Sequence, residues 1–372
     1  MKIFFLTLLA AYTGGNLYIF IKSLHLLQGA SLCSKIIYSI LFWLIAFSLF
    51  ISLFTRDVDY PTAIGRGIFI TGSVWMVFTL YMVLALLVTD IIRIAMPSLR
   101  ATMENYGLLC ALGATLLLLL YGYLNYRNPQ INKIQVESPL SKEVTTPQKT
   151  IKIVAISDVH LGNGTGKKLL GKYVQMINRQ NADIVFIAGD LIDNSVKPLY
   201  KMEMADELKK VNATMGIYMV PGNHEYISGI GASMEFIRQS GIKLLKDSVV
   251  TLPCGITLIG RDDRSNRERK PLEELVMQAK DAGAENPVVL LDHQPYELAK
   301  SDSLGIFLQI SGHTHRGQVW PLNWLTDKIY EQSHGYRKWK NSHIYVSSGL
   351  SLWGPPFRIG TKSDMAVIEI KL

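Results

Sequence analysis

Cysteine is scarce in this sequence of 372 residues, which contains three: Cys33, Cys110 and Cys254. The first two lie in or beside apolar segments, so a single cysteine remains in the more polar part of the chain. This count excludes a disulfide framework and a thiolate metal site. It gives no information about the cellular compartment.

Charge is almost missing from the first third of the chain. Residues 1–124 contain 7 Lys and Arg and 4 Asp and Glu, whereas the remainder contains 31 basic and 26 acidic residues. This mild positive excess argues against nucleic acid as a partner and is compatible with a membrane surface or a phosphorylated ligand. The length allows about two domains. We expect a membrane region (1–124), a linker with an edge strand (125–150) and an α/β domain (151–372).

Four long apolar runs occupy the first part of the chain, at residues 3–21, 36–54, 68–88 and 107–123. The last three carry no charge, and each has about the 20 residues needed to cross the hydrocarbon core of a bilayer. Polar residues interrupt the first run, which lacks a small-residue cleavage pattern and therefore favours a retained helix over a signal peptide. The sequence predicts an all-α region of four transmembrane helices, in an integral protein of a bacterial-type inner membrane.

The basic residues that flank these runs do not fix the orientation in the membrane. Four spans would place both ends of the membrane region on one side, where five basic residues stand against four on the other. The positive-inside rule needs a clear excess. A cytoplasmic position of the α/β domain is therefore only a working expectation.

From residue 151 the pattern changes to short apolar segments that alternate with amphipathic ones. We predict strands at 151–156, 184–188, 217–220, 256–259, 288–291, 306–310, 343–346 and 365–370, and helices at 167–179 and 199–211. Nearly continuous β-branched runs are typical of strands covered on both faces. The pattern predicts an α/β domain in which two sheets stack between outer helices, a four-layer αββα sandwich.

Five of these strands end in side chains that can bind a metal ion. In chain order these side chains are Asp158, His160, Asp190, Asn223, His224, His293, His313 and His315. Ligands of open α/β sheets bind outside the carboxyl ends of the strands. Glycines at 189, 222 and 312 precede key members, which indicates tight turns where the backbone approaches a ligand closely.

Taken one at a time, these residues have ordinary structural explanations. Asp190 after a glycine is as typical of a turn or a helix cap, and Asn223 can cap a following helix. His293 before a Gln-Pro pair resembles a common loop histidine. His313 and His315 are more specific, because alternate residues of an extended segment face the same side. The ordered set, rather than any one member, indicates a metal site.

The order Asp-x-His, Gly-Asp, Gly-Asn-His-Glu, a lone His and Gly-His-Thr-His resembles the calcineurin-like metallophosphoesterase superfamily over residues 151–372. In that family two divalent ions share a bridging aspartate. The resemblance implies one ion on Asp158, His160, Asp190 and His315, and a second ion on Asp190, Asn223, His293 and His313. His224, which is not a ligand in this assignment, would face the substrate phosphate, polarising it or protonating the leaving oxygen.

The chemistry of this ligand set is consistent with that assignment. Three oxygen donors and four imidazoles without a thiolate suit Mn²⁺, Fe or Zn²⁺ better than Ca²⁺ or Mg²⁺. We expect manganese, with iron or zinc as alternatives. Two ions about 3.5 to 4 Å apart would lower the pKa of a bridging water and present it as hydroxide to phosphorus. A histidine such as His224, with an ordinary pKa of about 6.5, can donate a proton near neutral pH.

Two further stretches, residues 311–319 and 345–360, resemble a branch of membrane-associated bacterial phosphodiesterases that includes UDP-2,3-diacylglucosamine hydrolases. The branch implies hydrolysis of a phosphoester or pyrophosphate bond in a lipid-linked substrate. Arg316 stands where the branch usually has a glycine, so either the pocket is narrower or a guanidinium contacts the substrate phosphate. The membrane region lies outside these motifs, so the substrate is not inherited with them.

Two more residues are candidates for substrate binding. Trp324, in an apolar stretch after His315, either contacts an acyl chain or the bilayer, or belongs to a small satellite core under long loops. Arg261, in a basic stretch, either grips a second phosphate or lies in a solvated loop.

Two alternatives to a lipid-directed hydrolase stay open. One is a broad-specificity phosphodiesterase whose helices are only an anchor. The other is a membrane sensor or transport unit with a metal-binding domain that does not turn over. The sequence does not indicate the oligomeric state.

Overall fold

The computed structural model describes the chain except for residues 1, 56–57, 59, 139–148 and 283–286. Much of the expected linker, at residues 139–148, therefore lies outside the described residues. The chain divides into two compact units. The first unit comprises Met1–Leu124 and Gly354–Phe357, and the second comprises Asn125–Trp353 and Arg358–Leu372.

The first unit is built from long helices. These are α1 (Lys2–Leu24), α2 (Leu32–Phe54), α3 (Thr62–Ala95) and α4 (Arg100–Tyr126). In the described part of the chain, three helical segments are long and apolar enough to cross a membrane: Leu32–Phe54, Thr62–Ala95 and Pro97–Tyr126. Four spans were predicted, whereas three helices within the described residues meet the length and hydropathy that a span requires. The polar residues 13–16 interrupt the apolar sequence of α1.

The polar interruption of α1 is used for packing. Asn16 is fully buried, and its Oδ1 accepts hydrogen bonds from Trp75 Nε1 at 2.7 Å and from Thr79 Oγ1 at 3.2 Å, both on α3. Elsewhere on α3, a Cβ placed on Gly72 would lie 2.0 Å from the backbone nitrogen of Leu49 on α2. A small residue at this position lets the two helices approach closely.

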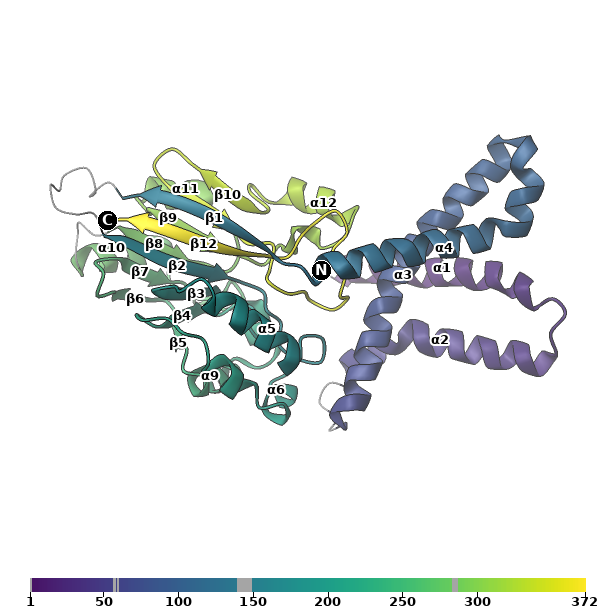
Figure 1. Ribbon diagram of the computed structural model, residues 1–372, viewed down its shortest axis with the longest axis horizontal. Helices are drawn as coiled ribbons and strands as arrows, with labels where there is room; N and C mark the ends of the chain where they lie inside the picture. Colours follow the sequence, from purple (N-terminus) through teal and green to yellow (C-terminus); the bar gives the residue numbers. More distant parts are fainter. Residues whose placement is uncertain (1, 56–57, 59, 139–148, 283–286) are drawn as a thin grey trace. The chain divides into compact units, whose positions relative to one another are not determined.

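The second unit contains two six-stranded sheets (Figure 1). The first sheet has the order β1 (Gln130–Glu137), β12 (Asp364–Lys371), β2 (Thr150–Ile156), β3 (Ile184–Ala188), β4 (Ile217–Val220) and β5 (Lys243–Leu244). The strands from β2 to β5 are parallel. Strand β12 is antiparallel to β2, and β1 pairs in parallel with β12 at the sheet edge.

The second sheet follows a similar plan. Its order is β10 (Gly335–Lys338), β11 (His343–Val346), β9 (Leu308–Ser311), β8 (Val288–Leu291), β7 (Thr257–Gly260) and β6 (Ser248–Thr251). The four central strands are parallel, and the edge strands β6 and β10 are antiparallel to their neighbours. The parallel strands of each sheet therefore deliver their carboxyl ends at one edge of that sheet.

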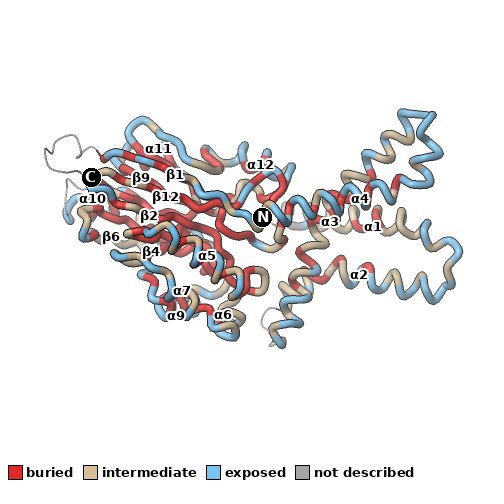
Figure 2. Tube along the Cα trace, in the orientation of Figure 1, coloured by how far each residue is buried: buried red, intermediate tan, exposed pale blue. Residues whose placement is uncertain are grey.

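Alternate residues of the central strands enter different cores. On β2, Ile153 faces a core shared by the two sheets, whereas Val154 faces a core shared with helices. Those helices include α5 (Lys167–Asn178) and α9 (Ile230–Gln239), and α10 (Leu272–Asp281) covers the second sheet. Burial on both faces explains the continuous apolar runs. The predicted α/β class with stacked sheets between helices is confirmed (Figure 2).

Local differences from the prediction have identifiable causes. The single helix predicted at 199–211 is two short helices, α6 (Lys197–Lys201) and α7 (Met204–Leu208), because the backbone turns left-handed at Glu203, with φ 50°. The edge strands β6 and β10 were not predicted. They are only partly buried and lack the apolar runs of the central strands.

Candidate metal centre

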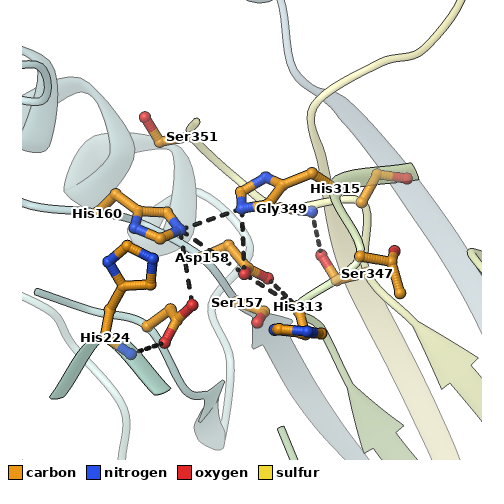
Figure 3. A network of polar contacts seen from close by, with 12 residues as sticks. Ser157, Asp158, His160, His224, His313, His315, Ser347, Gly349 and Ser351 are labelled. Carbon is orange, nitrogen blue, oxygen red and sulfur yellow. Dashed lines mark hydrogen bonds and ion pairs between the residues drawn. The ribbon is translucent and has the colours of Figure 1, made fainter. Parts of the chain in front are cut away.

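The predicted ligands come together where the two sheets deliver their strand ends. Strands β2, β3 and β4 lead to Asp158, Asp190 and Asn223, and strands β8 and β9 lead to His293 and His313. Figure 3 shows Asp158 with His160 and His315 on one side and His313 on the other. Residues far apart in the sequence thus share one buried centre.

A first cluster of ligand atoms surrounds Asp158. The Nε2 atoms of His160 and His315 face each other at 3.1 Å, and His315 Nε2 lies 3.4 Å from Asp158 Oδ1. His160 Nε2 is 3.8 Å from Asp158 Oδ1 and 3.8 Å from Asp190 Oδ2. These four side chains direct two nitrogens and two carboxylate oxygens toward a common point.

A second cluster shares the carboxylate of Asp190. Its Oδ2 lies 3.1 Å from His293 Nε2, which in turn lies 3.2 Å from Asn223 Oδ1. His313 Nδ1 lies 2.9 Å from the same Asn223 oxygen. The atom Asp190 Oδ2 therefore belongs to both clusters, the arrangement that two neighbouring cations with one bridging carboxylate require.

Burial and the neighbouring carboxylates shift the pKa values of the ligand imidazoles in opposite directions: those of His313 and His315 are lowered, and those of His160 and His293 are raised. Burial lowers the pKa of His315 to about 3 and that of His313 to about 4, so both imidazoles are neutral at pH 7 with a lone pair to offer. Burial also lowers the pKa of His160, but hydrogen bonding to Asp158 and Asp193 outweighs it and raises the pKa to about 10. A cation must displace that proton to bind.

The backbone of the centre is held in an unusual conformation. Five of the seven predicted ligands have a positive φ: Asp158 (54°), His160 (46°), Asp190 (54°), His313 (71°) and His315 (46°). Left-handed backbone is uncommon for residues other than glycine, and such strain gathers at functional sites. The surrounding fold therefore keeps these side chains aimed at one place at a cost in local conformational energy.

Glycines allow the ligands to approach one another. A Cβ on Gly312 would lie 1.8 Å from Ser157 Oγ and 2.4 Å from Asp158 Oδ2. A Cβ on Gly222 would lie 2.2 Å from Asp190 Oδ1. Real Cβ atoms do not make such contacts, so any side chain at either position would displace a carboxylate of the centre.

Comparison with known proteins agrees with this geometry. A family model described as Calcineurin-like phosphoesterase matches residues 151–317. An uncharacterized metallophosphoesterase of Helicobacter pylori (strain J99 / ATCC 700824) is 31% identical over 278 residues, which cover 74% of this chain and 73% of that protein. The chain belongs to the calcineurin-like metallophosphoesterase family.

Two further matches have different coverage. The transmembrane protein with metallophosphoesterase domain of Danio rerio is 32% identical over 274 residues, which cover 70% of this chain and 62% of that protein. The crystal structure of a 5'-nucleotidase precursor from Thermus thermophilus is matched at a TM-score of 0.37 and 16% identity, over 55% of this chain and 50% of that one.

Membership of the metallophosphoesterase family makes the chain a metal-dependent phosphoester hydrolase. The family implies divalent metal ions, and groups of candidate ligands lie at the strand ends described above. The described part of the chain also contains three helices apolar enough to span a membrane, as expected for a relative of proteins named transmembrane.

Glu225 supports the metallophosphoesterase centre and was not predicted. Its carboxylate is fully buried and accepts hydrogen bonds from the backbone nitrogens of Asp190 (3.0 Å), Ile192 (3.0 Å) and Gly222 (2.7 Å). Burial raises the pKa of Glu225 to about 7. The residue ties the end of β3 to the end of β4. The sequence signal was its position as the last member of Gly-Asn-His-Glu.

Asp193 orients two histidines and was also not predicted from the sequence. His224 donates from Nδ1 to the backbone oxygen of Asp193 at 3.0 Å, and Asp193 Oδ1 lies 3.4 Å from the same nitrogen. The same carboxylate oxygen lies 3.6 Å from His160 Nδ1. A proton on Nδ1 of His224 leaves Nε2 as the nitrogen that can face a ligand. The signal was a second aspartate three residues after Asp190.

Arg358 holds the His315 loop through hydrogen bonds to backbone oxygens. It is fully buried and donates from Nη1 to the backbone oxygen of His315 at 2.7 Å. Its Nη2 donates to the backbone oxygens of Gly349 and Ser351, both at 3.1 Å, and to that of Ser348. Burial lowers the pKa of Arg358 to about 10, which keeps the guanidinium charged at neutral pH.

The candidates for substrate binding occupy different environments. Arg261 is only 5% exposed, and its Nη1 lies 3.1 Å from Asp292 Oδ2, so the alternative of a solvated loop is wrong for this side chain. Arg316, next to His315, is partly exposed, with Nε 4.0 Å from Asp327 Oδ1. Trp324 is 59% exposed, which excludes a satellite core for its ring.

Proposed function

We propose that this protein is a membrane-bound dinuclear metallophosphoesterase that hydrolyses a phosphoester or pyrophosphate bond in a lipid-linked substrate. The observation that carries the dinuclear assignment is the shared oxygen Asp190 Oδ2, which lies 3.8 Å from His160 Nε2 and 3.1 Å from His293 Nε2. Manganese suits the mixed oxygen and imidazole donors, with iron or zinc as alternatives.

Each of the two clusters would hold one metal ion. Asp158, His160 and His315 would hold one ion, Asn223, His293 and His313 would hold the other, and Asp190 would contact both. Bound ions would lower the pKa of a water molecule and neutralise charge on the transferring phosphoryl group. The buried carboxylates and imidazoles would fix the ligand geometry before the substrate arrives.

His224 is proposed as the general acid. Burial and the nearby His160 lower the pKa of His224, but the carboxylates of Asp190 and Asp193 outweigh them, and the net shift is upward. This shift favours the protonated imidazole that a general acid needs. The ring centroids of His224 and His160 are 4.5 Å apart, at the edge of the first cluster. Asp193 fixes the orientation of the His224 ring. A proton on Nε2 can then pass to the oxygen of the leaving group.

A lipid-linked substrate is supported by the position of apolar surface near the centre. Trp324 and its exposed neighbours follow the His315 loop, in a chain with helices that can span a membrane. We place residues 1–124 in a bacterial-type inner membrane, residues 125–150 as the linker and edge strand, and residues 151–372 as the catalytic domain on the cytoplasmic side. Arg316, beside His315, is the proposed contact to a substrate phosphate, with Arg261 as a buried support next to Asp292.

The experiment that tests this function uses the full chain, purified in detergent and never exposed to chelator. We expect about two equivalents of bound metal by mass spectrometry, Mn²⁺-dependent cleavage of bis(p-nitrophenyl) phosphate, and faster cleavage of a polyprenyl pyrophosphate or other phospholipid-like ester. Equal rates on soluble and lipid esters would favour the anchored broad-specificity phosphodiesterase. Bound metal without cleavage of any ester would favour a sensor, and a metal-free inert protein would refute the proposal.

A further inference from the structure

Helix α12 (Leu322–Ile329) exposes its apolar side chains and buries two of its polar ones. Its apolar side chains Leu322, Trp324, Leu325 and Ile329 are 46%, 59%, 51% and 57% exposed, whereas the polar Asn323 and Thr326 are buried. A surface helix of a soluble domain normally buries its apolar stripe. Pale blue colour along α12 in Figure 2 marks the exposure.

Helix α10 of the same unit provides the contrast. It buries Leu272, Leu275 and Val276 against the second sheet and turns Glu273 and Glu274 outward. Both helices have one apolar side, but only that of α10 is covered. The inverse burial of α12 is therefore a property of this helix and not of the unit that carries it.

Trp320 extends the exposed side of α12. It is 37% exposed, and its ring packs edge-on against that of Trp324 with centroids 5.4 Å apart. We define the apolar face as Trp320, Leu322, Trp324, Leu325 and Ile329. Tryptophan pairs with aliphatic residues are typical of helices that lie in the interface of a bilayer, and a cationic side chain such as Lys328 can extend to the headgroups.

The apolar face is tied to the point where the chain enters the second unit. Asn125, near the end of α4, donates from Nδ2 to the backbone oxygens of Arg358 (2.8 Å) and Thr361 (2.9 Å). Between these two residues, the backbone oxygen of Ile359 accepts a hydrogen bond from the backbone nitrogen of Trp320 at 2.7 Å. Because Asn125 belongs to a helix that can span a membrane, Trp320 is linked to the residue at which the chain leaves that helix.

We propose that the apolar face of α12 inserts into the bilayer interface and holds the metal centre at the level of the lipid headgroups. The occupant of the face is the membrane in which the same chain is anchored. The continuity from Asn125 through residues 358–361 to Trp320 favours this occupant over a second protein. The inference extends the proposed function, because it assigns a docking surface that does not depend on which ester is cleaved.

Insertion would act directly on the metal-binding loop. The turn η4 (His315–Gly317) packs on the start of α12 so tightly that a Cβ on Gly317 would lie 2.5 Å from the carbonyl of Leu322. Thr314 Oγ1 donates to the backbone oxygen of Ser333 at 2.5 Å, just beyond the helix. The loop with His313 and His315 is therefore braced on both ends of α12, and a helix fixed in the interface fixes the loop.

The test measures depth rather than turnover, so it can fail independently of the proposed enzymatic activity. The three cysteines are replaced by serine in the full chain, and a nitroxide label is attached at Leu325→Cys. The matched control is Met277→Cys, at a 66% exposed apolar position on α10. Each protein is placed in nanodiscs of phosphatidylcholine and phosphatidylglycerol, and collisions with oxygen and with a water-soluble nickel chelate are measured by power saturation.

We expect the label at 325 to collide several-fold more with oxygen and several-fold less with nickel than the label at 277. Equal access of nickel to both labels would overturn the proposal, since the face would then be in water. Protection of the 325 label from both reagents would also overturn it, because a protein partner or a second copy of the chain would then cover the face. Folding of each variant is checked by its metal content.

Discussion

The two sheets contribute different chemistry to the metal centre. The first sheet supplies the oxygen donors Asp158, Asp190 and Asn223 together with His160, whereas the second sheet supplies only imidazoles, His293 among them. Each cluster draws on both sheets: His315 completes the first around Asp158, and His293 completes the second around Asp190.

In the proposed assignment, each ion would take ligands from both sheets. The carboxylates bring the negative charge that neutralises a divalent ion, and the imidazoles bring nitrogen donors that set its geometry. Because each cluster takes ligands from both sheets, the centre is complete only when the sheets have stacked. A bound ion would then act as a cross-link, and part of its binding free energy would appear as folding free energy.

The largest expected effect comes from the one residue that serves both clusters. Asp190→Asn should lower turnover by at least about 1000-fold, because both sites lose a shared anion and several kcal/mol of charge stabilisation. Metal content and turnover are measured on the same preparation. Asp206→Asn, at an exposed carboxylate, is the matched control. Two bound ions and full activity in the Asp190 variant would contradict the shared-ligand assignment.

A variant of His224 tests whether a residue beside the first sheet contributes to turnover without binding metal. His224→Ala should lose about 100- to 1000-fold in rate and keep its metal, because proton donation contributes on this scale. Because the pKa of His224 is raised, we expect activity to fall as the pH rises through that pKa and the imidazole loses its proton. This alkaline fall should be absent in the variant and is followed in pH–rate profiles. A fully active variant would remove the general-acid role.

Arg358 tests how the second sheet holds its imidazole in place. Arg358→Met leaves several buried carbonyls without donors and should lower the free energy of unfolding by about 3 kcal/mol. Because one of these carbonyls belongs to His315, the ion of the first cluster should be lost first. Denaturant unfolding and metal stoichiometry are compared with Arg238→Met, at an exposed arginine. Equal losses in the two variants would contradict this support role.

Proton competition distinguishes His160 of the first sheet from His315 of the second sheet, although the pKa of His293 in the second sheet is also raised. The pKa of His160 in the first sheet is raised to about 10, whereas that of His315 is lowered to about 3, so at pH 7 the metal must displace a proton from the first but not from the second. Metal affinity should therefore increase roughly tenfold per pH unit for each proton released, up to about pH 10. Calorimetry in two buffers of different ionisation enthalpy measures the release. Identical heats would contradict it.

The smallest effect concerns the surface beside the second sheet. Replacing Leu325 and Ile329 together by serine should leave cleavage of a soluble aryl phosphodiester unchanged and slow cleavage of an ester embedded in vesicles by about threefold, because less apolar area enters the interface. The paired control replaces Met277 by serine. Equal slowing on both substrates would indicate a folding defect instead.

The strand ends and the candidate ligands could be predicted because each signal is local. An apolar run followed by Asp158, or by Gly-Asp at 189–190, is visible within a short stretch of sequence, and the order of the motifs is typical of the metallophosphoesterase family. The stacked α/β architecture followed from the same runs. These features depend on neighbours in the chain, which a sequence displays directly.

The features that were missed depend on contacts between distant residues. Arg358 supports His315 from 43 positions away, and Glu225 supports Asp190 from 35 positions away. No periodic pattern in the sequence indicates either contact. The buried role of Asn16 was equally unpredictable, because its partners Trp75 and Thr79 lie 59 and 63 positions away. The inverse burial of α12 is equally invisible, since an apolar stripe does not reveal what covers it.

The parallel pairing of β1 with β12 has a consequence for biosynthesis. Gln135 and Glu369 are partners across this pair although 234 positions separate them, and β12 lies between β1 and β2. The strand that follows the membrane helices therefore emerges from the ribosome long before the segment that will bind it. Closing so long a loop is slow. This edge strand therefore stays unpaired at least until the segment that forms β12 has been synthesised.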